Sequence, residues 1–281
     1  MCLRLLPLVF YELSRRILFD SARLHARSSA DVLEVATLLN LSAKYSCTRL
    51  HASALHLLSR QFPSSLERWD KRKYNVHFER HVFEVADAAR EARAWTLLPT
   101  ALLHCCLRQA ANAMIGFTPA QSAECYALSE ENAKAVDQSQ QYLASEIHKD
   151  VFPDFYSPDA LPELCYTPHH CVRAKAKLSK WMAASSFCWC YRAPTFDGWL
   201  KTWGFCQHCQ RTYGQQYRDG RVEVWNSLPR VFGLGTWEAL ADKQREEEQA
   251  RVAESDTASV SSSETRAESV TELAVKADLS L

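Results

Sequence analysis

Apolar residues recur at the spacing of a helix face in five successive segments between residues 30 and 150. In the first segment, Val32, Val35, Ala36 and Leu39 fall three or four positions apart, which is the period of an amphipathic α-helix. Each apolar stripe is too narrow to bury a helix alone, so neighbouring helices must share one core. The pattern therefore predicts a mainly α fold of packed helical hairpins, with helices that start near residues 28, 49, 78, 97 and 129.

The composition supports a helical fold and disfavours an enzyme. Glycine is scarce, at 7 of 281 residues, which is not typical of a glycine-rich nucleotide fold or of an all-β fold with many tight turns. The sequence contains no G-x-G-x-x-G, G-x-x-x-x-G-K-[ST], H-E-x-x-H or G-x-S-x-G motif. The adjacent His104 and Cys105 would point apart on their predicted helix, so they do not make a nucleophile pair. We therefore expect a non-enzymatic protein.

The character of the chain changes after about residue 155. Residues 171–237 hold six of the eight tryptophans and most of the candidate metal ligands. No aromatic residue follows Trp237, and the composition beyond it is typical of a short frayed helix at about 238–252 and then disorder. We expect an unassigned N-terminal segment (1–25), a helical domain (26–155), a small Cys/Trp-rich module (156–240) and a disordered acidic, Ser-rich tail (241–281).

Four cysteines in the Cys/Trp-rich module have the spacing of a metal site. Cys206 and Cys209 form a C-x-x-C turn, which places two thiolates on one metal ion, and Cys165 and Cys171 form a looser C-x5-C pair. Tetrahedral zinc requires four such ligands. The sequence therefore predicts a structural Zn²⁺ on Cys165, Cys171, Cys206 and Cys209. The residues that could replace one of these ligands are His169, His170, His208, Cys188 and Cys190.

Other interpretations of the cysteines and aromatic residues stay open. The four cysteines could be buried or idle thiols, or a redox C-x-x-C pair, which the absence of a surrounding βαβ pattern disfavours. Cys105 and Cys106 are expected to pack as small hydrophobes in the core of a helix. A peptide-binding face could be formed by Arg221, Trp225, Leu228, Pro229 and Phe232, but we expect that the aromatic residues among them fill the core of the small Cys/Trp-rich module.

The charges are unevenly placed, although the formal net charge is zero. Residues 171–230 carry 10 Lys and Arg against 3 Asp and Glu, whereas residues 238–281 carry 5 against 11. Basic side chains can neutralise phosphates, and the interleaved tryptophans can stack on unpaired bases. A zinc-dependent nucleic-acid-binding or transcriptional regulatory protein is therefore the alternative function. No helix-turn-helix or zinc-finger spacing supports it, and a basic solvated face explains the same residues.

The sequence gives no indication of a membrane segment. No stretch approaches the ~20 apolar residues that a membrane-spanning helix requires. The apolar start of the chain is short, is interrupted by Pro7 and is followed at once by Glu12 and Arg15, so we do not expect a signal peptide. The chain is expected inside the cell, in the cytoplasm or the nucleus. There its 11 cysteines would be thiols or metal ligands rather than disulfides.

Between residues 31 and 70 the chain contains the stretches D-V-L-E-V-A-T-L-L-N-L-S-A-K-Y, R-L-H-A-S-A-L-H-L-L and F-P-S-S-L-E-R-W-D. They resemble the end of the BTB domain in the BTB/POZ-domain proteins of basidiomycete fungi, and later stretches resemble the C-terminal part of the same proteins. The helix pair that follows the BTB domain is similar to F-E-V-A-D-A-A-R-E-A-R-A-W-T-L-L-P-T-A-L-L-H-C-C. Later in the chain, C-Y-T-P-H-H-C and G-F-C-Q-H-C-Q resemble two cysteine pairs of the family. The stretch G-R-V-E-V-W-N-S-L-P-R-V-F-G-L resembles the family's closing motif. The resemblance covers about residues 30 to 240, and the elements that begin a BTB domain are missing from it.

The resemblance implies a function in protein–protein interaction, as an adaptor or scaffold. BTB proteins as a class often recruit partners to cullin-type ubiquitin ligases or to transcriptional complexes, and by analogy this chain would do the same. A third hypothesis, a non-functional truncated product, rests on the missing BTB start.

Overall fold

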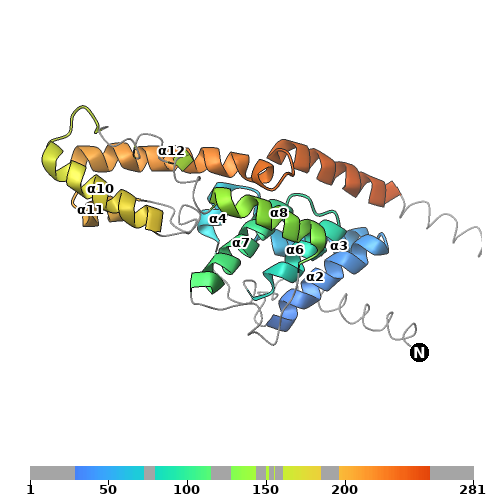
Figure 1. Ribbon diagram of the computed structural model, residues 1–281. Coiled ribbons are helices and arrows are strands. Elements are labelled where there is room, and N and C mark those ends of the chain that lie inside the picture. Colours follow the sequence, from blue (N-terminus) through green and yellow to red (C-terminus); the bar gives the residue numbers. More distant parts are fainter. Residues whose placement is uncertain are drawn as a thin grey trace, which may run out of the picture.

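The computed structural model describes residues 29–72, 80–114, 128–143, 150–151, 155, 161–184 and 196–253. Every regular element in these ranges is a helix, so the predicted mainly α fold is confirmed. Figure 1 labels α2 (Ser29–Lys44), α3 (Thr48–Ser59), α4 (Leu66–Lys71), α6 (Val82–Glu91), α7 (Leu98–Met114), α8 (Glu130–Gln141), α10 (Pro168–Ala184), α11 (Asp197–Thr202) and α12 (Gln207–Val231). A last helix without a label follows α12 and occupies residues 237–253.

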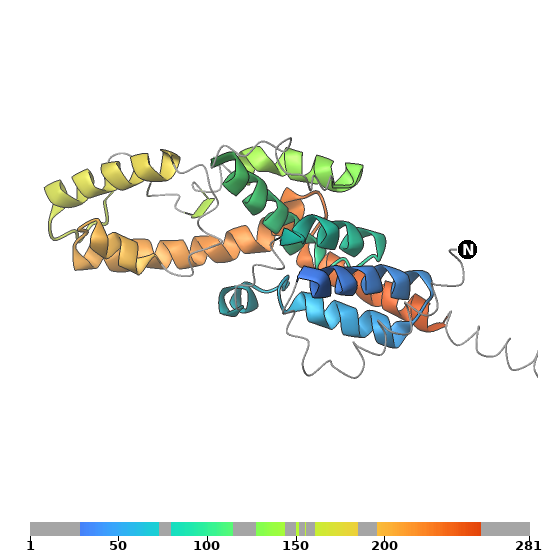
Figure 2. The same cartoon turned by 90° about the horizontal axis from the view of Figure 1, so that it is seen from below.

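Helices α2, α3, α4, α6, α7 and α8 form a group that we call the helical body (Figures 1 and 2). Helix α2 packs against α3 and α6, α6 packs against α7, and α7 packs against α8. The predicted apolar stripes supply the core of this body. The side chains of Val32, Leu39, Ala54, Val85 and Leu102 are all fully buried.

The carboxylate of Asp87 on α6 fixes the start of α8. It accepts hydrogen bonds from the backbone N–H of Ser129 (3.0 Å), from the hydroxyl of Ser129 (2.6 Å) and from the side-chain amide of Asn132 (2.7 Å). Its negative charge also lies at the positive end of the α8 dipole. The helix that the sequence predicted near residue 129 is therefore held by a neighbouring helix, and the side chain of Ser129 does not cap it.

Helix α12 joins the two ends of the molecule. In both views it runs from α10 and α11 towards the helical body (Figures 1 and 2). Arg221 donates to both carboxylate oxygens of Asp70 on α4 (2.9 and 2.6 Å), and the indole N–H of Trp225 donates to the carbonyl of Ser64 (3.0 Å). The ring centroids of Trp225 and Trp69 are 5.4 Å apart. Trp225 is thus buried as expected, and Arg221 is buried beside it, but both pack on the helical body and not in the core of a separate zinc module.

The last helix packs back on the helical body. The ammonium of Lys243 lies 3.7 Å from the centroid of the Trp95 ring, Arg93 pairs with Glu247 at 3.1 Å, and Arg251 is buried. The helix that was expected to be frayed at about 238–252 is therefore present and docked. Residues 241–253 of the expected disordered tail belong to it, because the helix continues past residue 240. The rest of that tail and the N-terminal segment 1–25 lie outside the described residues.

Candidate metal centre

The four predicted cysteines come from the starts of two helices. Cys165 lies in the turn before α10, and Cys171 lies in the first turn of that helix. Cys206 is the N-cap residue of α12, and Cys209 lies in the first turn of α12. Each helix thus contributes one thiol from just outside its start and one from inside.

The structure brings these four thiols together. All four sulfur atoms lie within 4.8 Å of one another, and those of Cys165 and Cys206 are 3.8 Å apart. A tetrahedral zinc ion with Zn–S bonds of about 2.3 Å separates its sulfur ligands by about 3.8 Å. A disulfide would need a sulfur–sulfur distance of about 2.05 Å, and all four cysteines are free. The spacing of the sulfurs therefore fits one four-thiolate metal ion.

Backbone groups at the start of α12 favour the thiolate form of Cys206, whereas burial raises the pKa of Cys165 and Cys209. The N–H of Cys206 donates to the sulfur of Cys171 (3.3 Å), and the Thr167 hydroxyl lies 3.3 Å from the same sulfur. Burial opposes ionisation of Cys206, but hydrogen bonds, above all from the backbone N–H groups of Cys209 and Tyr166, outweigh it and lower the pKa of Cys206 to about 6. Helix N-termini carry a partial positive charge that adds to this effect. The thiolate is the form of cysteine that binds a metal.

The turn before Cys206 requires a glycine. Gly204 has a φ of +81°, and a Cβ at this position would lie 2.8 Å from Nε2 of His170 on α10. A side chain there would meet both a strained backbone and a close neighbour. Phe205 anchors the next position, since its ring packs edge-on against Tyr213 with 5.7 Å between centroids. The Gly-Phe pair before the C-x-x-C turn is a sequence signal for this turn, and cysteine spacing alone misses it.

The alternative ligands do not join the cluster. His169 and His170 are exposed, and the ring of His208 packs against Tyr166 with 5.9 Å between centroids. In the part of the chain that the structure describes, the four cysteines are the one group of three or more metal-binding side chains that converges. Cys188 and Cys190 lie outside the described residues.

Two further cysteines, Cys105 and Cys106, are core residues of the helical body, as the sequence predicted. Both are buried on α7, and the Cys105 thiol donates to the carbonyl of Val82 at 3.7 Å. Burial raises the pKa of Cys106 to about 12 and that of Cys105 well above its usual value. Neither thiol belongs to the described group of converging metal-binding side chains.

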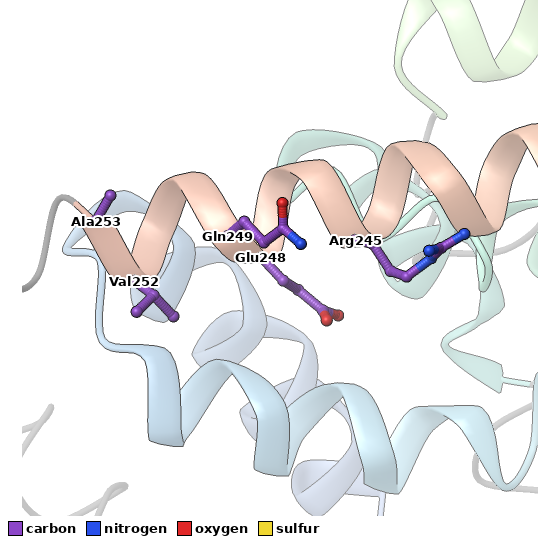
Figure 3. A pocket seen from close by; sticks show the side chains of 5 residues that line it. All are labelled: Arg245, Glu248, Gln249, Val252 and Ala253. Carbon is purple, nitrogen blue, oxygen red and sulfur yellow. The ribbon is translucent and has the colours of Figure 1, made fainter.

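A hollow on the last helix is a weaker candidate for a site. It has a volume of about 450 Å³ and is lined by Arg245, Glu248, Gln249, Val252 and Ala253 (Figure 3). All five residues are exposed and belong to one helix. Binding sites for small molecules are concave and hold a few polar groups in a fixed, convergent arrangement. An open hollow along a single exposed helix does not fit that description.

Comparison with known proteins does not assign the chain to a family. No family model matches it, and no curated protein or solved structure matches it either. None of the described helices is long and apolar enough to cross a bilayer. Fold and site thus define a class only: a protein that is helical throughout its described part, with four clustered cysteines at the starts of two helices. The resemblance to BTB proteins stays a prediction.

Proposed function

We propose that this chain is a non-enzymatic interaction protein whose four-cysteine cluster holds one structural Zn²⁺. The cluster itself carries the proposal, because four thiols fill the tetrahedral shell of a zinc ion. Structural zinc sites have four protein ligands, whereas catalytic sites keep one position for water or substrate. Zinc in such a closed site stabilises the fold and leaves no position for a reacting molecule.

An exposed apolar surface beside the cluster supports a role in binding another protein. Leu164 and Tyr166 flank Cys165 in the chain and are 69% and 64% exposed. Val172 follows Cys171 and is 42% exposed. Exposed apolar side chains close together in the chain are candidate contacts for a partner. Zinc on Cys165 and Cys171 would fix the segment that carries these side chains, so metal binding and partner binding would be coupled.

The resemblance to BTB/POZ proteins indicates the kind of partner. Under this proposal the helical body corresponds to the late BTB helices plus the helices that follow them, and the cysteine-bearing helices extend it. The protein partner would belong to a cullin-type ubiquitin ligase or to a transcriptional complex, in the cytoplasm or the nucleus. This step is an analogy between folds.

Elemental analysis of protein purified without chelator tests the metal site. We expect about one zinc per chain, since four-thiolate sites bind a single ion. Replacing each of the four clustered cysteines by Ser in turn should abolish stoichiometric zinc. Cys47→Ser is the matched control, because Cys47 is a half-buried thiol outside the cluster. Well-folded protein without zinc would contradict the proposal.

Affinity purification followed by mass spectrometry tests the interaction surface. A protein that depends on this surface should be recovered with the parent chain and lost with Tyr166→Ser. Val222→Ser is the control, because Val222 is an exposed apolar residue (48%) on α12. Recovery of the same proteins with both variants would show that the surface around Tyr166 is not the interface.

Nucleic-acid binding is the second candidate, because α10 presents a basic face. Arg173, Lys177 and Lys180 are exposed and are spaced so that they share one side of the helix. Contacts to phosphates weaken steeply as the salt concentration rises. Fluorescence anisotropy with single-stranded and double-stranded oligonucleotides over a salt series tests the idea. Binding that is salt-sensitive and lost in Lys177→Glu supports it, and no binding at low salt excludes it.

A further inference from the structure

The four clustered thiols differ in access to solvent. Cys171 and Cys209, inside the first turns of their helices, have no exposed surface. Cys165 and Cys206, just before the same helices, are half-buried. The two half-buried sulfurs are also in contact with each other, at 3.8 Å. The accessible thiols are therefore a pair that joins two helices, and the protected thiols are the other pair.

We propose that Cys165 and Cys206 are an oxidation-sensitive pair, which a peroxide converts to a disulfide with release of the metal. This inference rests on the proposed function, because it assigns a regulation to the same cluster. The pair differs from the one that cysteine spacing alone would suggest. The C-x-x-C turn of Cys206 and Cys209 is the usual form of a redox pair, whereas the structure favours a bond between α10 and α12.

The reaction balances with one hydrogen peroxide as oxidant. One thiolate attacks a peroxide oxygen, the O–O bond breaks, and the products are a sulfenic acid and hydroxide, which takes up a proton to form water. The second thiolate attacks the sulfenic sulfur, the S–S bond forms, and hydroxide leaves and becomes a second water. The two sulfurs lose two electrons, and the peroxide takes up these electrons and two protons.

Access and distance select this pair. A peroxide arrives from solvent and meets Cys165 or Cys206 before the buried Cys171 and Cys209. Closing a 3.8 Å contact to a bond of about 2.05 Å needs a shift of roughly 2 Å. Cys165 lies in a turn rather than inside a helix, so its backbone can make that shift. The metal would keep only two thiolates, too few for a closed tetrahedral site.

The disulfide would preserve part of the structure after the metal leaves. It would tie the turn before α10 to the start of α12, where the metal had tied them before. Reduction would restore all four thiols, and metal could then bind again. Oxidation would thus change the surface at Leu164 and Tyr166 reversibly, because both residues flank Cys165 in the chain.

Peptide mapping of the full chain tests which cysteines pair. Zinc-loaded protein is treated with one equivalent of hydrogen peroxide, free thiols are alkylated, and the chain is digested with trypsin. Cys165 and Cys171 then fall in peptide 150–173, and Cys206 and Cys209 fall in peptide 202–211. A Cys165–Cys206 disulfide joins these two peptides, whereas a Cys206–Cys209 disulfide leaves them separate. Chymotryptic cleavage after Tyr166 and fragmentation of the second peptide then identify the bonded cysteines.

We expect the joined peptides to predominate, bonded through Cys165 and Cys206, with one zinc released per disulfide. A thiol reductant with added zinc should reverse both changes, and Cys47→Ser should behave like the parent chain. A predominant Cys206–Cys209 bond, or a disulfide that forms while zinc stays bound, would overturn the inference. Neither result would contradict the proposal that the reduced protein binds zinc. Protein that never contains zinc would refute the proposed metal site instead, and its peptide map would still decide between the two pairs.

Discussion

Arg218 and Arg221 lie about one turn apart on α12, but their surroundings differ. The side chain of Arg221 is 5% exposed and that of its partner Asp70 is 24% exposed. Arg218 pairs with Asp197 at 3.4 Å, and both of these side chains are about half exposed, at 44% and 54%. Water and salt screen the second pair, so it adds little to stability. Loss of Arg221 would leave the Asp70 charge without its partner at a partly buried site.

Arg221→Ala should therefore lower the free energy of unfolding by about 3 kcal/mol, and Arg218→Ala by less than about 1 kcal/mol. Urea denaturation of the two variants beside the parent chain measures both effects. A double-mutant cycle with Asp70→Ala should give a clear coupling energy for Arg221. Equal effects of the two substitutions would show that the buried pair does not anchor α12.

His51 is a buried histidine that the structure holds neutral. Its Nε2 lies 2.6 Å from Nη1 of Arg251, and the same guanidinium donates to the carbonyl of Ala92. Arginine has only donors, so Nε2 of His51 must accept and Nδ1 must carry the proton, within 3.5 Å of the Ser42 hydroxyl. Burial, and next the charge of Arg251, lower the pKa of His51 from 6.5 to about 4.

This shift makes stability depend on pH in a defined window. Between pH 6.5 and about 4 the unfolded chain binds a proton at His51 and the folded chain does not. The contribution of His51 is therefore complete above pH 6.5, falls by up to about 1.4 kcal/mol per pH unit as the pH drops, and levels off below pH 4. His51→Gln keeps an acceptor for Arg251 and should flatten this part of the pH profile. His56→Gln, at an exposed position on the same helix, should leave it unchanged.

At the scale of elements, α12 approaches the backbone of Val151 closely at one of its own residues, Gly220. A Cβ on Gly220 would lie 2.3 Å from the carbonyl oxygen of Val151, and backbone atoms cannot rotate away as a side chain can. Gly220→Ala should therefore cost about 1–3 kcal/mol of unfolding free energy by overpacking. Gly198→Ala on α11 is the control, because no atom lies within 4 Å of a Cβ there. That change should be neutral or stabilising by up to about 1 kcal/mol, and thermal unfolding compares the two.

The last turn of α12 shows how a helix-breaking residue fits into a helix. Pro229 has no N–H to donate to the carbonyl of Trp225, four residues earlier. The indole N–H of Trp237 donates to that carbonyl instead, at 2.8 Å, and the two tryptophan rings stack at 5.9 Å. The carbonyl that Pro229 leaves without a helical donor thus accepts the hydrogen bond that holds the turn between α12 and the last helix.

The sequence predicted five of the six helices of the body, but it did not predict α4, α10, α11 or α12, and for α12 the reason is physical. Helices such as α2 bury one face in a single core, so their apolar residues recur with a clear period. In α12 the buried positions Tyr213, Tyr217, Val224 and Leu228 have the same period, but they face two different neighbourhoods and lie among cysteines, tryptophans and Pro229. The four metal-site cysteines could be chosen from spacing. The convergence of their four sulfur atoms could not be predicted from spacing, because it requires the starts of α10 and α12 to lie side by side.

At the scale of the whole molecule, two packed regions share α12. Its first half lies over the thiols and an aromatic cluster, where the ring centroids of Phe155 and Tyr213 are 5.0 Å apart. Its second half is anchored to the helical body through Arg221 and Trp225. In the helical body, α2 packs on α3 and α6, and α6 packs on α7, while its buried side chains continue into the same hydrophobic core as those around the thiols. The metal site therefore lies at one end of a helix whose other end is anchored to the helical body through Arg221 and Trp225.

This arrangement predicts a local response to metal removal. After treatment with a zinc chelator, amide hydrogen exchange should rise several-fold in residues 161–184 and 203–213, because these residues are held by the thiols. Residues 29–72 and 80–108 should keep their protection, since α2, α3, α6 and α7 pack against one another. Along α12, the change from raised to unchanged exchange should occur near Arg221, because its ion pair with Asp70 holds this part of the helix on the helical body. Uniform loss of protection would mean instead that zinc, α12 and the helical body unfold as one cooperative unit.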